Sequence, residues 1–142
     1  MKKFFIWILF IPFIAASAGV GDWKIVGEEG DFWLQSTTDS KTKNLITKRT
    51  GESKVISTKD VGEDHEIIVY YTGMAGTFKL VDIYYAQIFN KKTKKFLGDY
   101  PWEYKSQNNP DEKLPQPKWE IGTKSISISD EQTTIQKVIQ LN

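Results

Sequence analysis

Short stretches of apolar and β-branched residues alternate with turn residues at nearly regular spacing from residue 19 to residue 138. This rhythm is typical of β-sandwiches and β-barrels, whereas helices need longer runs with a helical period. The sequence therefore predicts a mainly β fold, either an antiparallel sandwich or a small barrel. The turn at residues 50–52 is expected to close a hairpin between two of the strands. The expected strands cover residues 23–26, 32–38, 45–48, 54–58, 65–72, 77–89, 96–97, 119–121 and 125–129.

Two of these segments are apolar on both faces. Residues 67–71 read Ile-Ile-Val-Tyr-Tyr, without a polar position between them. In residues 77–89 the odd positions from Val81 to Phe89 and the even positions from Phe78 to Ile88 are both mostly apolar. A strand with one wet face alternates apolar and polar residues, whereas a strand covered on both faces does not. These segments are predicted to be central strands with other elements packed on both sides.

The C-terminal region contains two different patterns. Residues 125–129 alternate serine and isoleucine strictly, which predicts a strand with one buried face. Ser129 and Gln132 then have the spacing of a helix capping box. Since Ile135, Val138 and Ile139 would lie on one helical face, residues 130–141 are predicted to form a short C-terminal helix. A last strand is the alternative.

The first eighteen residues have the pattern of an export signal. Lys2 and Lys3 precede an apolar run at residues 4–16, and Ala16-Ser17-Ala18 has the small residues of a signal peptidase site. A membrane-spanning helix needs about 20 apolar residues, more than this run supplies. We expect cleavage after Ala18, which leaves residues 19–142 as a single β-rich domain. The expected location is the bacterial periplasm, or the medium outside the cell.

Composition narrows the possible functions of the mature chain. The sequence has 19 basic and 18 acidic residues, and removal of Lys2 and Lys3 leaves a net charge of −1. Such a charge gives no reason to expect nucleic-acid binding or attraction to a membrane surface. Cysteine is absent, which excludes disulfides, thiol catalysis, thiolate metal sites and a lipid-bearing cysteine. The mature protein is expected to be soluble, without a membrane span, a cofactor or a metal.

An aromatic segment followed by a polar loop is the candidate binding surface. Tyr100, Trp102 and Tyr104 surround Pro101, and tyrosine and tryptophan dominate interface hot spots. Residues 106–118 then carry three prolines among polar residues, which predicts a long exposed loop. The alternative is that the three rings alternate along a strand and pack on the core. The proposed contact residues are Tyr100, Trp102, Tyr104, Asn108, Asn109 and Lys113.

The charged clusters have structural explanations. Residues 60–66 combine the only histidine with four carboxylates, but their spacing does not match an EF-hand or a zinc site. A solvated turn explains them. The lysines of residues 91–95 fit a soluble hairpin tip. Asp82 lies in the most apolar segment, where a hydrogen bond to a tyrosine or lysine is the expected role.

These patterns predict a protein that acts by binding. The leading hypothesis is a protein partner in the cell envelope, as for an inhibitor or neutraliser of an enzyme or toxin, or an envelope accessory factor. The alternative is a small-ligand carrier. The third hypothesis is a hydrolase that uses Asp82 with a second carboxylate. For a carrier, the rings expected to line a barrel interior are Tyr70, Phe78, Tyr84 and Phe89.

Overall fold

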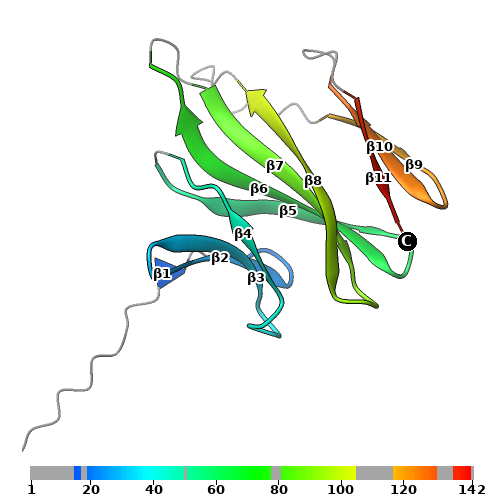
Figure 1. Ribbon diagram of the computed structural model, residues 1–142, viewed down its shortest axis with the longest axis horizontal. Coiled ribbons are helices and arrows are strands. Elements are labelled where there is room, and N and C mark those ends of the chain that lie inside the picture. The colour runs from blue at the N-terminus through cyan, green and yellow to red at the C-terminus, as the bar shows by residue number, and fades with distance from the viewer. Residues whose placement is uncertain are drawn as a thin grey trace, which may run out of the picture.

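The computed structural model describes residues 15–16, 19–49, 51–77, 81–104, 117–130 and 136–141. All regular elements of these residues are β-strands, arranged in three antiparallel sheets (Figure 1). The first sheet has the order β1-β2-β3-β4, with β1 Ala15–Ala16, β2 Trp23–Glu28, β3 Asp31–Ser36 and β4 Lys43–Ile46. The middle sheet has the order β5-β6-β7-β8, with β5 Lys54–Val61, β6 His65–Ala75, β7 Val81–Asn90 and β8 Lys95–Tyr104. The third sheet has the order β11-β10-β9, with β9 Lys118–Ile121, β10 Ser125–Ser129 and β11 Gln136–Gln140.

The predicted mainly β class is confirmed. None of the described residues forms a helix, and these residues therefore contain no candidate membrane-spanning helix. The choice between a sandwich and a barrel stays a prediction.

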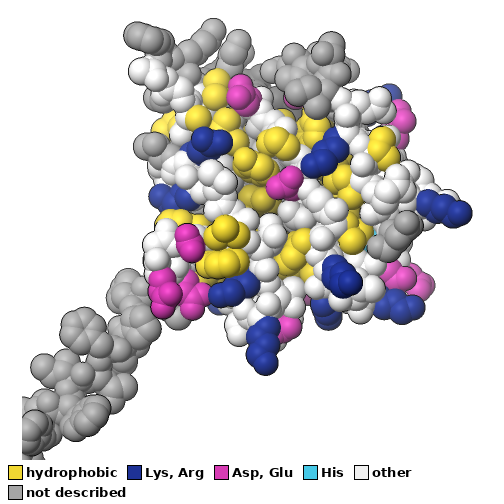
Figure 2. Space-filling model, viewed as in Figure 1, with side chains coloured by type: hydrophobic (Ala, Val, Ile, Leu, Met, Phe, Trp, Pro, Cys, Tyr) yellow, Lys and Arg dark blue, Asp and Glu magenta, His cyan; other side chains and the backbone are white. Residues whose placement is uncertain are grey.

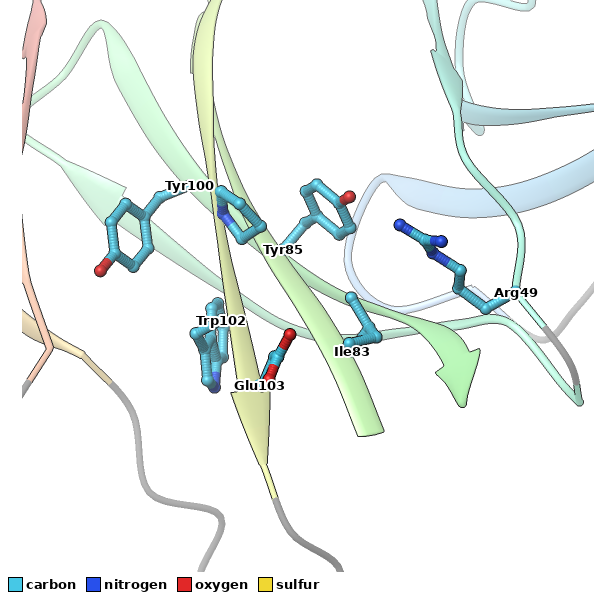
Figure 3. A pocket seen from close by; sticks show the side chains of 7 residues that line it. Arg49, Ile83, Tyr85, Tyr100, Trp102 and Glu103 are labelled. Atoms are coloured by element: carbon cyan, nitrogen blue, oxygen red, sulfur yellow. The ribbon is translucent and has the colours of Figure 1, made fainter. Parts of the chain in front are cut away.

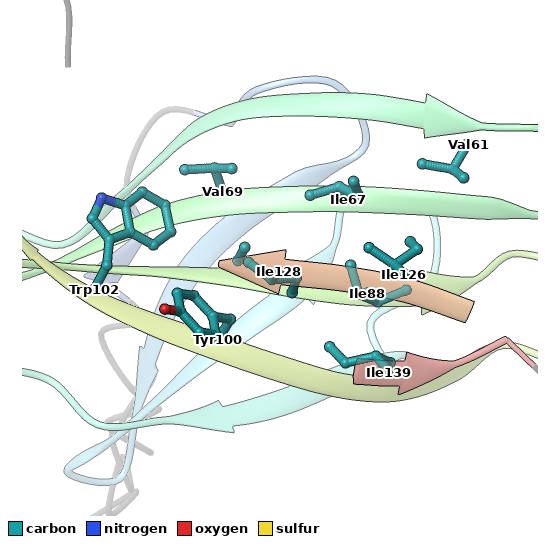
Figure 4. Packing of buried hydrophobic residues seen from close by; sticks show 10 residues of the cluster. Val61, Ile67, Val69, Ile88, Tyr100, Trp102, Ile126, Ile128 and Ile139 are labelled. Carbon is teal, nitrogen blue, oxygen red and sulfur yellow. The ribbon is translucent and has the colours of Figure 1, made fainter. Parts of the chain in front are cut away.

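The middle sheet lies between two hydrophobic cores. One face of β6 contributes Ile67 and Val69 to a core shared with the third sheet, which we call the third-sheet core (Figure 4). The other face contributes Ile68 and Tyr70 to a core shared with the first sheet, the first-sheet core. Successive side chains of a strand point to opposite faces, so a strand covered on both sides must be apolar throughout. In β7, Ala86 and Ile88 likewise belong to the third-sheet core and Phe89 to the first-sheet core, so the predicted cover on both faces is confirmed for the described part of the two segments.

Trp23 anchors the first sheet to the middle sheet. Its side chain is 2% exposed and packs edge-on against Phe89 and Phe96, with ring centroids 4.8 and 5.6 Å away. The indole Nε1 donates a 2.9 Å hydrogen bond to Glu66 Oε2 on β6. A buried tryptophan needs such an acceptor for its N–H. This contact therefore satisfies the only polar atom of a large buried side chain.

The predicted C-terminal helix is wrong, and the alternative of a last strand is confirmed. Residues Gln136–Gln140 form β11, which pairs with β10 through Ile139 opposite Ile126. A helix would bury Val138 and Ile139 on one face, but Val138 is 51% exposed and Ile139 is 4% exposed. The alternation of a strand explains both values. Ile135 and Gln132 lie outside the described residues.

The predicted hairpin across residues 50–52 is also wrong. The strand before this turn, β4, pairs with β3, whereas the strand after it, β5, pairs with β6. The turn residues resemble a hairpin loop, but here the chain passes from the first sheet to the middle sheet. Turn chemistry marks where a strand ends and does not determine which strand it pairs with.

Candidate functional site

The aromatic segment of the sequence lies on β8, at the edge of the middle sheet. Pro101 lacks an N–H group, and an edge strand is where a sheet tolerates this loss. Tyr100 and Trp102 are 2% and 5% exposed and belong to the third-sheet core. The structure thus places these two rings as the core-packing alternative describes. The side chain of Tyr104, and all of Asn108, Asn109 and Lys113, lie outside the described residues, so their contact role stays a prediction.

Trp102 packs in an aromatic stack at one end of its core. Its ring is stacked on Tyr84 of β7, with centroids 5.5 Å apart and an interplanar angle of 20°. Its Nε1 atom is buried and has no hydrogen-bond partner among the described residues. The energetic contribution of this ring is therefore packing.

A hollow of about 300 Å³ lies on the face of β8 that is turned away from the third-sheet core (Figure 3). Tyr85 is paired with Pro101 across β7 and β8, and Ile83 is paired with Glu103, so each pair lies on one face of the sheet. Tyr100 and Trp102 also border the hollow, but Figure 3 shows their rings projecting to the other side of the strand. Within the aromatic segment, it is Pro101 and Glu103 that belong to the face of the hollow.

Arg49 forms the facing wall of the hollow. Its backbone N–H donates a 2.7 Å hydrogen bond to the carbonyl of Thr72, which fixes the chain after β4 against β6. Its guanidinium points toward Tyr85 in Figure 3. It is the only arginine of the chain, and it forms no ion pair with the described carboxylates. An exposed arginine with its donors open can bind a carboxylate or stack on a ring.

Tyr85 forms the floor of the hollow, and the buried ring of Tyr70 packs against it. Tyr85 is stacked on Tyr70, with centroids 5.5 Å apart and an interplanar angle of 9°. Burial, with smaller contributions from Asp99 and Tyr85, raises the pKa of Tyr70 well above its usual value. Tyr70 therefore stays neutral. Its ring supports Tyr85 on the side turned away from the hollow. The hollow combines the aromatic ring of Tyr85, the Arg49 guanidinium, which has no ion-pair partner among the described residues, and the carboxylate of Glu103.

The surface visible in Figure 2 carries both signs of charge. Lysine and arginine side chains and carboxylates are interspersed there among exposed hydrophobic side chains. This face therefore presents mixed contacts, without the single-sign field that steers highly charged ligands.

Asp82 has the structural role expected for it. The Tyr71 hydroxyl donates a 2.8 Å hydrogen bond to Asp82 Oδ1. Burial, then the hydrogen bond and charge of Asp82, and then Tyr84 raise the pKa of Tyr71 above its usual value. In the described residues the hydrogen-bond partner of Asp82 is thus a tyrosine.

Replacing Asp82 with alanine should lower the pKa of Tyr71, because the hydrogen bond and the negative charge would both be lost. An ultraviolet titration at alkaline pH should show one tyrosine ionising earlier in Asp82→Ala than in the wild type, with Tyr71→Phe identifying the signal. The raised pKa stabilises the fold fully below the pKa of unfolded tyrosine, about 10, and this stabilisation disappears as pH rises through the folded value. Superimposable titration curves would contradict this assignment.

The acidic turn and the lysine tip lie side by side and interact. Gly62, Glu63 and Asp64 form the exposed turn between β5 and β6. The carbonyl of Asp64 accepts a hydrogen bond from the Lys91 N–H, and Lys91 Nζ lies 3.0 Å from Asp60 Oδ1. The described residues contain no group of three or more side chains able to hold a metal ion.

The aromatic rings expected to line a barrel do not share one interior. Tyr70 and Phe89 are buried in the first-sheet core, at 2% and 3% exposed, while Tyr84 packs against the third-sheet core. Phe78 lies outside the described residues. The three described rings fill cores on opposite faces of the middle sheet.

Sequence reasoning missed Arg49, Tyr85 and Glu103. The only available signal was that Arg49 is the one arginine among the basic residues. Its approach to β7 and β8 depends on the crossing between two sheets, which the sequence does not specify.

Comparisons with protein-family models, with curated proteins and with solved structures give no match to this chain.

Proposed function

We propose that the protein is exported to the periplasm and acts there by binding a protein partner. The leader at residues 1–18 supports export, and the mature chain, residues 19–142, contains all residues of both described cores. We also infer that the three sheets act as a layered sandwich, which gives the binding surface a rigid support.

The hollow between Arg49 and Tyr85 is the observation that carries this proposal. Arginine and tyrosine are enriched at the centres of interfaces, where they fill or form pockets for an anchoring side chain. Here the Arg49 guanidinium has no ion-pair partner among the described residues, the Tyr85 ring is stacked on Tyr70, and Pro101 adds a surface with little conformational freedom. Such preorganised groups lose little entropy when a partner binds.

The partner is expected to present an apolar side chain with an acidic group beside it. The apolar group would pack on Tyr85 and Pro101, and the acid would accept hydrogen bonds from Arg49. A protein that blocks or accompanies an envelope enzyme or toxin in this way fits the inhibitor, neutraliser or accessory role. Capture from an envelope extract, followed by mass spectrometry of the bound proteins, would identify the partner.

Arg49→Glu should reduce partner capture from an envelope extract by about tenfold or more, because it reverses the charge on one wall of the hollow, where the partner's acid is expected to bind. The matched control is Lys124→Glu, the same charge change at an exposed turn between β9 and β10. Quantitative mass spectrometry of the captured proteins, with circular dichroism of each variant, provides the readout. Equal recovery by Arg49→Glu and the wild type would rule out this surface.

A small ligand is the second candidate, because a hollow of about 300 Å³ is at the lower end of the range for small-molecule sites. Native mass spectrometry of protein purified from the periplasm distinguishes the two. A bound mass that disappears in Arg49→Glu would favour the carrier.

A further inference from the structure

The outer edge of β2 is covered by a segment that export would remove. In the first sheet β1 pairs antiparallel with β2, with Ala15 opposite Gly27 and Ala16 opposite Val26. Both alanines belong to the expected leader, which would be cut after Ala18. Cleavage would therefore leave β2 as an open edge strand, and an open edge is a template for another strand.

The geometry of β2 identifies the backbone groups that point outward. The Trp23 N–H and C=O bond to Val20, on the side away from β3, whereas the Asp22 carbonyl accepts a bond from Thr37 on the β3 side. Because successive residues of a strand direct their backbone groups to opposite edges, Ile25 and Gly27 also face outward. These two residues would carry the unpaired donors and acceptors of the mature edge.

We propose that a second copy of this chain pairs with the edge, strand β2 against strand β2, about a two-fold axis at Val26. Antiparallel pairing of identical strands produces a closed, two-fold dimer. With the axis at Val26, Ile25 of each copy lies opposite Gly27 of the other, so the outward backbone groups meet. This inference depends on the proposed loss of the leader.

The side chains favour this register. Lys24 lies opposite Glu28 of the second copy, where Glu28 also keeps its 2.8 Å ion pair with Lys43 of its own chain, and the two-fold axis repeats this arrangement. Opposite charges directly across a sheet are stabilising and like charges are destabilising. Gly27 has no side chain to crowd Ile25 across the new ladder. Val20 occupies the outward groups of Trp23, and the turn at Glu29 and Gly30 ends the strand, so the pairing covers Lys24 to Glu28.

The other edge of the same sheet lacks this complementarity. Strand β4 reads Lys-Asn-Leu-Ile, so a two-fold pairing would offer a lysine on each copy without an acid opposite it. The charge pattern therefore selects β2 over β4.

Sedimentation velocity over a wide concentration range tests the dimer. The chain from Gly19 to Asn142, produced directly so that export is not required, should form a concentration-dependent dimer. Lys24→Glu should raise the dimer dissociation constant about tenfold by placing two acids opposite each other. The double variant Lys24→Glu/Glu28→Lys should restore dimerisation, because it exchanges the two charges.

Each outcome of this test decides the proposal. A chain from Ala15 to Asn142 keeps β1 on the edge and should stay monomeric. A monomeric Gly19 chain, a dimer unaffected by Lys24→Glu, or no restoration in the double variant would overturn the pairing, provided that circular dichroism shows each variant folded. Equal dimerisation of the Ala15 and Gly19 chains would overturn the role of the leader strand. These results do not depend on whether the hollow at Arg49 binds a partner.

Discussion

Trp102→Ala should lower the free energy of unfolding by about 3–5 kcal/mol, the cost of truncating a large buried aromatic side chain. Trp102 is 5% exposed, belongs to the third-sheet core and stacks on Tyr84. Its removal would leave a cavity at the end of the core and remove the ring contact. Urea denaturation followed by circular dichroism measures the change.

Trp102→Phe is the matched control for this experiment. Phenylalanine keeps an aromatic ring in the core, and the indole N–H gives up no hydrogen bond to the described residues. The expected cost is below about 1.5 kcal/mol. A change within about 0.5 kcal/mol for Trp102→Ala is typical of exposed positions and would contradict the core placement.

Two adjacent substitutions on β6 should each destabilise the fold by about 2–5 kcal/mol. Ile67 is 3% exposed in the third-sheet core, and Ile68 is 0% exposed in the first-sheet core. Truncation of either isoleucine to alanine would leave a cavity. In most sheets with one wet face, neighbouring residues differ sharply in cost, because only one of them is buried.

The unfolding free energies of Ile67→Ala, Ile68→Ala and the exposed control Val138→Ala provide this test. Val138 is 51% exposed on β11, so its substitution should change stability by less than about 0.5 kcal/mol. A large cost for only one of the two isoleucines would mean that one face of the middle sheet is open, which would contradict the layered arrangement.

The strand pattern of this protein could be predicted because local alternation reflects burial directly. Ser125–Ser129 alternates strictly, and its isoleucines at 126 and 128 are 0% exposed. The absence of alternation in β6 likewise indicated cover on both faces. In both strands, the physical cause is that each side chain has only two directions available.

The prediction of a C-terminal helix was wrong because a few apolar residues fit both the period of a helix and the period of a strand. Val138 and Ile139 are adjacent, so they fit one helical face as well as one buried and one exposed strand position. The strand forms because β11 pairs with β10. This pairing satisfies the backbone N–H and C=O groups along one edge of β10, which would lack partners if residues 136–140 formed a helix. The spacing of apolar residues within one segment contains no information about this pairing with another strand.

The candidate site was predicted only in part. The segment from Tyr100 to Tyr104 could be identified from its rings, yet the groups on the hollow include Pro101 and Glu103, while Tyr100 and Trp102 face the core. Arg49 lies far away in the sequence and reaches the hollow through a crossing between sheets. Such convergence depends on tertiary structure.

Photo-crosslinking in living cells tests most directly whether the hollow is the contact surface of an exported binding protein. A photoreactive amino acid at position 103, on the rim of the hollow, should give a discrete adduct with a partner in the envelope. The same group at position 124 should give none, because it lies on a different sheet. Adducts from position 124 alone, or equal adducts from both positions, would contradict the assignment of the hollow.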